Sequence, residues 1–252
     1  MFRRYVSPLY LATTLALALF IAGCSSDGDG ASGGEAGAAP AAAAADVSGD
    51  DSPYTLQQTF DLNIEVTSPV FSRIRRIPKE HSCGTRGKTL GRTYDQNYVF
   101  GAVYSNTSPP LNWTGVPEGT VSIAMIMESD QVRGESWSHW VIWNIPGDAT
   151  GLAAAVATTT EVRAIGPSAR QGVNDYKTIG YSGPCPVPVT VIDGQAKVKI
   201  VFEYFFRVYA LDVMLELGTD ISNNQLLRAI EGHIIGGGEI KGEFVASVIK
   251  AS

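Results

Sequence analysis

Charged residues are scarce in this 252-residue chain, at 17% of the sequence, while glycine is common, with 27 residues. A coiled coil would need far more charge and far less glycine, and a hydrophobic content of 44% excludes a wholly disordered chain. The sequence also lacks clustered lysine and arginine, and residues 53–252 have a net charge of only −2. Because binding to a nucleic-acid backbone needs clustered positive charge, nucleic acid is excluded as a partner.

The motifs of common catalytic and metal sites are missing as well. The chain has no Gly-x-Ser-x-Gly, no Walker loop, no His-Glu-x-x-His and no Cys-x-x-Cys. Its three histidines, His81, His139 and His233, are too scattered to predict a metal site, and each alone is more typical of a structural residue. We therefore predict no catalytic residues, no metal and no cofactor, and a hydrolase is a weak hypothesis because no nucleophile–base pair is visible.

The N-terminus has the pattern of an export signal. Arg3 and Arg4 precede an apolar run over residues 9–23 that is too short to span a bilayer comfortably. The run ends in the tetrapeptide 21–24 (IAGC), which resembles the lipobox of bacterial lipoproteins, where the cysteine is lipidated. We expect residues 1–23 to be a lipoprotein signal peptide and Cys24 to carry lipid. An ordinary signal peptide followed by a chance cysteine is the alternative.

Residues 24–52 continue as a segment that cannot form a hydrophobic core. They are almost entirely alanine, glycine, serine and aspartate, and Val47 is their only large aliphatic residue. We expect the lipidated cysteine and a disordered tether here, with a root-mean-square reach of about 30 Å. This arrangement predicts a protein anchored by lipid in the bacterial cell envelope, at the outer membrane or the periplasmic face, with residues 53–252 forming its folded domain.

The pattern of the folded part favours β-strands. Strands are predicted where polar and apolar residues alternate or where short β-branched and aromatic runs lie between turns, namely over residues 60–66, 121–127, 139–145 and 197–211. One helix is predicted over Ser222–Glu231, with Ser222 or Asp220 as its N-cap, and we expect Gly232 and the run Gly236–Gly238 to end it. The fold class is therefore mainly β, as a sandwich with a late helix.

Seven motifs carry a resemblance to a known family. They stand in the family's order between about Phe60 and Phe244, as IPKEHSC (77–83), SPPLNWTGVP (108–117), HWVIWNIP (139–146), GVNDY (172–176), GYSGPCP (180–186), YALD (209–212) and GHI (232–234). The chain resembles the phosphatidylethanolamine-binding protein (PEBP) family, in particular its bacterial Raf-kinase-inhibitor-like branch. This resemblance implies a β-sandwich of two antiparallel sheets with short peripheral helices. It also implies a small pocket for an anion such as phosphate or a phospholipid headgroup.

The resemblance assigns the pocket position by position. Its ligand-binding residues fall on Trp137, His139, Gly183, Pro184 and Tyr204. Three other pocket positions are altered: the family's two acidic loop residues are here Ser129 and Gln131, and its second histidine is here Phe202. These changes predict a more apolar pocket and weaker anion binding. With the ordinary histidine pKa near 6.5, that binding should strengthen at mildly acid pH.

Two further features remain open. If Cys24 carries lipid, Cys83 and Cys185 are left as a possible disulfide in an oxidising compartment, and the resemblance puts both in loops beside the pocket. The 24 residues Gly84–Thr107 form an insertion where the family has only a handful. An insertion here is either a lid or partner-binding loop, or a tolerated surface extension.

The function that the sequence predicts is a lipid-anchored, non-enzymatic binding module. Its expected partners are a small anion or a phospholipid headgroup, together with the membrane that holds its N-terminal lipid. The alternative is a protein-interaction or inhibitor module with a vestigial pocket and a protein partner.

Overall fold

The computed structural model describes residues 47, 51–72, 75–82, 105–130, 136–185, 189–191, 201–245 and 248–250. The predicted signal peptide, Cys24, Cys83, Gln131 and most of the insertion at 84–107 lie outside these residues. Within the described part of the chain, no helix is both long and apolar enough to cross a membrane.

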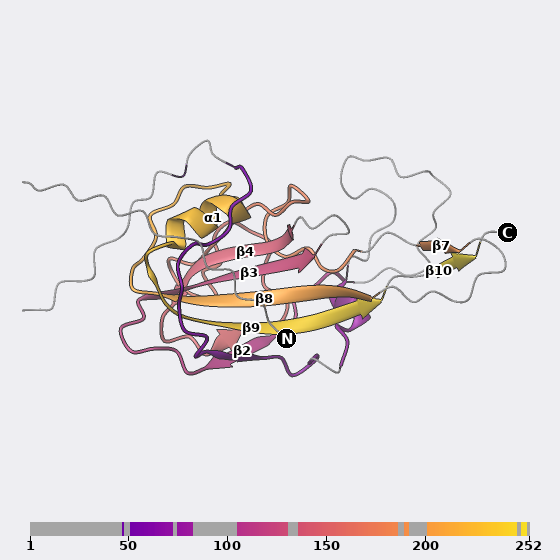
Figure 1. Ribbon diagram of the computed structural model, residues 1–252, viewed down its shortest axis with the longest axis horizontal. Helices are drawn as coiled ribbons and strands as arrows, with labels where there is room; N and C mark the ends of the chain where they lie inside the picture. The colour runs from indigo at the N-terminus through magenta and orange to yellow at the C-terminus, as the bar shows by residue number, and fades with distance from the viewer. Residues whose placement is uncertain are drawn as a thin grey trace, which may run out of the picture. The chain divides into compact units, whose positions relative to one another are not determined.

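A five-stranded antiparallel sheet forms the centre of the domain (Figure 1), in the order β6-β4-β3-β8-β9. Its strands are β3 (Ser122–Asp130), β4 (Ser136–Pro146), β6 (Arg170–Gln171), β8 (Val201–Leu211) and β9 (Ile234–Val245). Most residues of β3 and β4 are buried on both faces of the sheet, which explains their nearly continuous apolar sequences. The strands predicted over 121–127, 139–145 and 197–211 are confirmed in β3, β4 and β8.

A smaller antiparallel sheet covers one face of the central sheet. It consists of β1 (Glu65–Thr67), β2 (Leu111–Thr114) and β5 (Gly151–Leu152), in the order β1-β2-β5. Leu111 and Trp113 of β2 are fully buried in one core with Met125, Met127 and Phe206 of the central sheet. The mainly β sandwich of two antiparallel sheets is therefore confirmed. The remaining strands, β7 (Val189–Val191) and β10 (Val248–Lys250), form a separate parallel pair.

The opposite face of the central sheet is covered by α1 (Asn223–Ile230), which Figure 1 shows above β3 and β4. The Ser222 side chain accepts a hydrogen bond from the Gln225 backbone, and the Gln225 side chain accepts one from the Ser222 backbone. This reciprocal capping box fixes the start of the helix and confirms the predicted cap. Among the described residues, a short 3-10 helix, η1 (Lys79–His81), is the other helical element.

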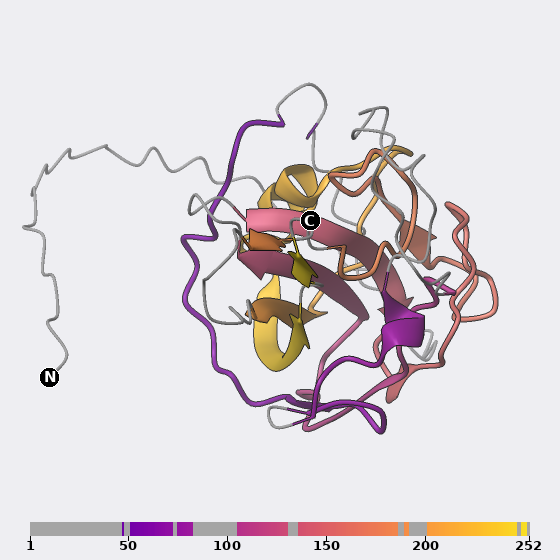
Figure 2. The ribbon, with the colours of Figure 1, turned by 90° about the vertical axis from the view of Figure 1, so that its right-hand side faces the viewer.

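The first described residues already belong to the domain. Val47 is buried in the core beneath α1, and the Arg228 guanidinium lies 4.1 Å from the centre of the Tyr54 ring. Ser222 donates a hydrogen bond to the Asp51 carboxylate. The end of the predicted tether thus contacts the helix, although its composition favours no core of its own. Figure 2 shows the chain then passing from the α1 side to the opposite side of the sheet, where β1 begins.

Two details of the predicted elements are wrong. The strand predicted over 60–66 begins only at Glu65, in β1; Leu62 is 76% exposed, and the backbone of Asp61 and Ile64 instead hydrogen-bonds to Gly237 of β9. Gly236–Gly238 do not end the helix but lie inside β9; Gly232, at φ +86°, follows the C-cap residue Glu231. A Cβ at Gly238 would lie 2.1 Å from the Ile64 carbonyl oxygen. Glycine is needed there because another backbone passes close to β9.

Candidate functional site

A β-bulge in β4 places His139. Met127 of β3 pairs with Trp140, whereas the next residue, Glu128, pairs with Ser138, so His139 is an additional residue in β4. A bulge interrupts the alternation of side chains between the two faces of a sheet and redirects them locally. The imidazole consequently lies on the same side as Trp140, facing the smaller sheet.

Both ring nitrogens of His139 are hydrogen-bonded. Nδ1 lies 2.7 Å from the Ser182 carbonyl oxygen, and Nε2 lies 3.0 Å from the Ser129 hydroxyl oxygen. Since a carbonyl can only accept, Nδ1 carries the proton, and in the neutral ring Nε2 accepts from the Ser129 hydroxyl. The Ser182 carbonyl therefore determines that Nδ1 of His139 is a donor and Nε2 an acceptor, and that the Ser129 hydroxyl donates.

The His139 imidazole is neutral at physiological pH. The residue is only 1% exposed, and burial lowers its pKa from 6.5 to about 4, against the smaller raising effect of the Ser182 and Gly183 backbone. The expectation that His139 titrates at mildly acid pH, which used the ordinary pKa, is therefore wrong. The charge of this pocket histidine changes only in distinctly acid solution.

Aromatic rings surround the imidazole. The Tyr204 ring centre lies 5.1 Å and the Tyr176 ring centre 5.3 Å from that of His139, both edge to face. Trp137, partly buried, contacts Tyr176 in the same way at 5.6 Å. Tyr204 is 2% exposed, and burial raises the pKa of its phenol, which keeps the hydroxyl protonated. Three of the predicted ligand residues, Trp137, His139 and Tyr204, thus come together around Tyr176.

The predicted Gly-Pro wall also borders this cluster. A Cβ at Gly183 would lie 2.0 Å from the His81 carbonyl oxygen, so only glycine fits at this position. Its N–H donates to Asn106 Oδ1 at 2.8 Å, and the following Pro184 is buried. Asn106 belongs to the predicted insertion at 84–107, so the last residues of the insertion contact the loop beside His139.

Sequence reasoning missed the residue that holds this loop. Asn174 is 1% exposed and donates to the Gly180 carbonyl at 2.9 Å and to Ser182 Oγ at 3.1 Å, while its Oδ1 accepts from Thr178. It thereby positions the Ser182 carbonyl that orients His139. The motif GVNDY contains both Asn174 and Tyr176, but the sequence alone assigned neither of them a role.

The altered positions differ in their surroundings. Ser129 is buried and hydrogen-bonded to His139, so the residue that replaces the family's acidic group still contacts the imidazole. Phe202 is partly buried, packs against the sandwich core and lies opposite Phe244 of β9. Gln131 lies outside the described residues.

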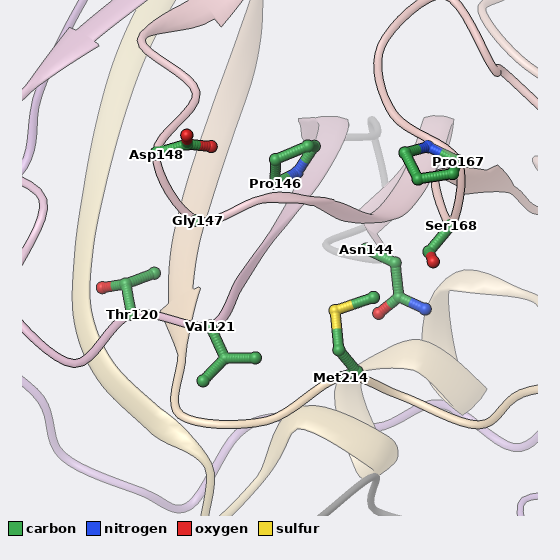
Figure 3. Close-up of a pocket in the computed structure, with 9 residues that line it drawn as sticks. All are labelled: Thr120, Val121, Asn144, Pro146, Gly147, Asp148, Pro167, Ser168 and Met214. Atoms are coloured by element: carbon green, nitrogen blue, oxygen red, sulfur yellow. The ribbon is translucent and has the colours of Figure 1, made fainter. Parts of the chain in front are cut away.

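A surface hollow of about 450 Å³ lies at the other end of β4 (Figure 3). Its wall includes Asn144, whose side-chain amide makes two 2.9 Å hydrogen bonds with the Leu215 backbone. None of the predicted ligand residues lines it; the lining consists of Thr120, Val121, Asn144, Pro146, Gly147, Asp148, Pro167, Ser168 and Met214. The hollow and the His139 cluster are therefore separate features. Among the described residues, no group of three or more His, Cys, Asp or Glu side chains could hold a metal ion.

The family model for phosphatidylethanolamine-binding protein matches residues 67–245, which include every described residue of the His139 cluster. The chain belongs to the PEBP family. A UPF0098 protein of Methanothermobacter thermautotrophicus is 37% identical over 65% of this chain and 95% of its own length. A UPF0098 protein of Chlamydia muridarum is 31% identical over 72% of this chain and 98% of its own.

Two PEBP crystal structures share the fold. A putative PEBP homologue of Chlamydia trachomatis has 30% identity and a TM-score of 0.52, over 72% of this chain and 96% of the other. YbcL of E. coli, a member of the mammalian PEBP family, has 26% identity and a TM-score of 0.57, over 74% of this chain and 99% of the other. The sandwich in Figure 1 is therefore the PEBP fold.

Proposed function

We propose that this PEBP-family protein is a binding module that holds a small ligand bearing a phosphate or phospholipid-headgroup-like part beside His139. The observation that carries the proposal is the gathering of Trp137, His139, Gly183 and Tyr204 from separate segments around one buried imidazole. Phe202, partly buried two residues before Tyr204, adds apolar surface. It favours a ligand with a hydrophobic part next to its anionic group.

Calorimetric titration of phosphate and of a phosphorylated amphiphile tests this proposal. We expect the amphiphile to bind more tightly than phosphate, and both to bind more tightly at pH 4.5 than at pH 7.5, because the pKa of His139 is about 4. His139→Ala should reduce this pH dependence to the part that comes from ionisation of the ligand's own phosphate group. Absence of binding by either compound at millimolar concentration would contradict the proposal.

A specific observation favours a second function, a protein-interaction or inhibitor module with a vestigial pocket. His139 already uses both ring nitrogens within the protein, and Asn106 ties the insertion to the pocket loop through Gly183. In that case the insertion side contacts a protein partner. The two functions are separated by the calorimetric titration, since only a ligand pocket responds to His139→Ala.

We further propose that the protein is exported and anchored by lipid on Cys24 in the bacterial cell envelope. The support is the IAGC tetrapeptide after an apolar run and the core-free segment that follows it. Cys24→Ala should release the protein from the membrane fraction or leave it unprocessed. Mass spectrometry of the mature wild-type N-terminus is the direct measurement, and a mature protein without acyl mass would refute the anchor.

We also propose that Cys83 and Cys185 form a disulfide beside the pocket. Its support is that lipid on Cys24 would leave Cys83 and Cys185 as the two remaining cysteines of an exported chain, although Cys83 itself lies outside the described residues. Alkylation of the unreduced mature protein should label neither cysteine, and labelling after reduction should add two equivalents. Two free thiols before reduction would rule out the bond.

A further inference from the structure

We propose that Ser129 is a nucleophile with His139 as its general base, and that this pair cleaves carboxylic esters. From the sequence a hydrolase is a weak hypothesis, because no nucleophile–base pair is visible there. The fold brings Ser129 Oγ within 3.0 Å of His139 Nε2. The activity goes beyond the proposed binding function and does not depend on it.

The pair has the geometry that an activated serine needs. The Ser182 carbonyl, 2.7 Å from Nδ1, holds the ring in the tautomer whose Nε2 lone pair faces the Ser129 hydroxyl. Asn174 fixes the loop that carries this carbonyl. Nucleophile, base and orienting group are therefore present in order, with a backbone carbonyl as the orienting group.

Tyr204 supplies a donor for the negative charge that develops during ester cleavage. It is the direct cross-strand partner of Ser129, so the two side chains leave the sheet on the same face. Its ring contacts that of His139, and its phenol is protonated. A neutral hydroxyl donor beside a buried serine is a suitable stabiliser for a tetrahedral oxyanion.

The reaction requires only an ester and water. Ser129 Oγ attacks the ester carbonyl carbon while its proton moves to His139 Nε2, and the carbonyl oxygen becomes an oxyanion held by Tyr204. On collapse the ester C–O bond breaks, and His139 returns the proton to the leaving alcohol, which leaves the acyl group on Ser129. Water then attacks the acyl carbon and gives a proton to His139; the carboxylic acid departs as Ser129 regains its proton.

The buried imidazole is a weak base, so proton removal from Ser129 should be slow, and esters with good leaving groups should react best. The probe is p-nitrophenyl acetate with the full-length protein. We expect a burst of one equivalent of p-nitrophenolate and a single acetyl group on Ser129 in peptide mass spectra. The acylation rate should be flat between about pH 6 and 8, because the base is already fully neutral there.

Variants assign the roles. Ser129→Ala should abolish the acetylated peptide, and His139→Gln should slow acylation by about 100-fold. Ser138→Ala is the matched control, because Ser138 is as deeply buried as Ser129 but pairs with Glu128 across the sheet. This variant should leave the acylation rate and the acetylated peptide unchanged.

Acetylation only at other residues, no acetylation, or an unchanged rate in His139→Gln would overturn the assignment. A rate that rises through about pH 6.5 would overturn it too, since that is the pKa of an ordinary exposed histidine. If Ser129→Ala fails to fold, peptide mapping of the wild type and the His139→Gln rate still decide. Phosphate binding in calorimetry is independent of these outcomes, so failure of the two proposals can be told apart.

Discussion

Between pH 7 and pH 4, the free energy of unfolding should fall by about 3 kcal/mol because of His139 alone. The folded-state pKa of about 4 lies below the unfolded value of 6.5, so in this range the unfolded chain binds the proton more readily. The stabilisation is fully present above pH 6.5 and is lost as pH falls toward 4. Chemical denaturation at a series of pH values measures this loss.

His139→Gln isolates the contribution of this one side chain. The variant should be less stable than the wild type at pH 7, because the amide cannot reproduce both ring hydrogen bonds. The difference should shrink by about 3 kcal/mol at pH 4, since other titrating groups act equally on both proteins. A difference that stays constant with pH, or an NMR titration of His139 centred near 6.5, would show that the imidazole is not buried in this way.

Glu128→Gln should destabilise the fold by about 3 kcal/mol, whereas Glu239→Gln should cost about 1 kcal/mol or less. Both carboxylates pair with Arg207, but the Glu128 side chain is 8% exposed and that of Glu239 is 36% exposed. Glu128 also accepts hydrogen bonds at 2.8 Å from Ser136 Oγ and from Asn223 Nδ2. The glutamine side chain introduced at this buried position would place its NH2 group, a donor, against the donors that now bind the carboxylate.

The two glutamates form a matched pair for this measurement, because the substitution and the cation are the same, while Glu128 is more buried and accepts two further hydrogen bonds. Urea unfolding with an unchanged m-value reports the two stability changes directly. Equal effects at the two positions would mean that burial does not control the strength of these pairs. A larger effect at Glu239 would contradict the packing of β3 beneath α1.

Local patterns were sufficient to predict three long strands of the central sheet and the helix. The apolar runs of β3, β4 and β8 and the cap at Ser222 are properties of a few neighbouring residues, and all appear as expected. The failures come from features that depend on distant partners. Gly236–Gly238 resemble a helix terminator in sequence, but their reason is the close passage of residues 60–64 over β9.

At the candidate site, too, the residues that match the family could be predicted, whereas the contacts that depend on the whole fold could not. Resemblance could assign Trp137, His139 and Tyr204 to the pocket, since pocket positions of the family fall on each of them. It described Ser129 only as the replacement of an acidic residue of the family, so its hydrogen bond to His139 was not predicted. The low pKa of His139 also escaped prediction, because burial is a property of the whole sandwich and not of the segment around the histidine.

Because of the bulge, the direction of the His139 side chain depends on the number of residues in β4 and not only on which side chains are present. Deleting Ser138 would remove this bulge and would bring His139 opposite Glu128, on the helix side of the sheet. The imidazole, its serine and its tyrosine would all still be encoded, yet no longer together. A single lost codon in a buried strand can therefore separate these side chains without replacing any of them.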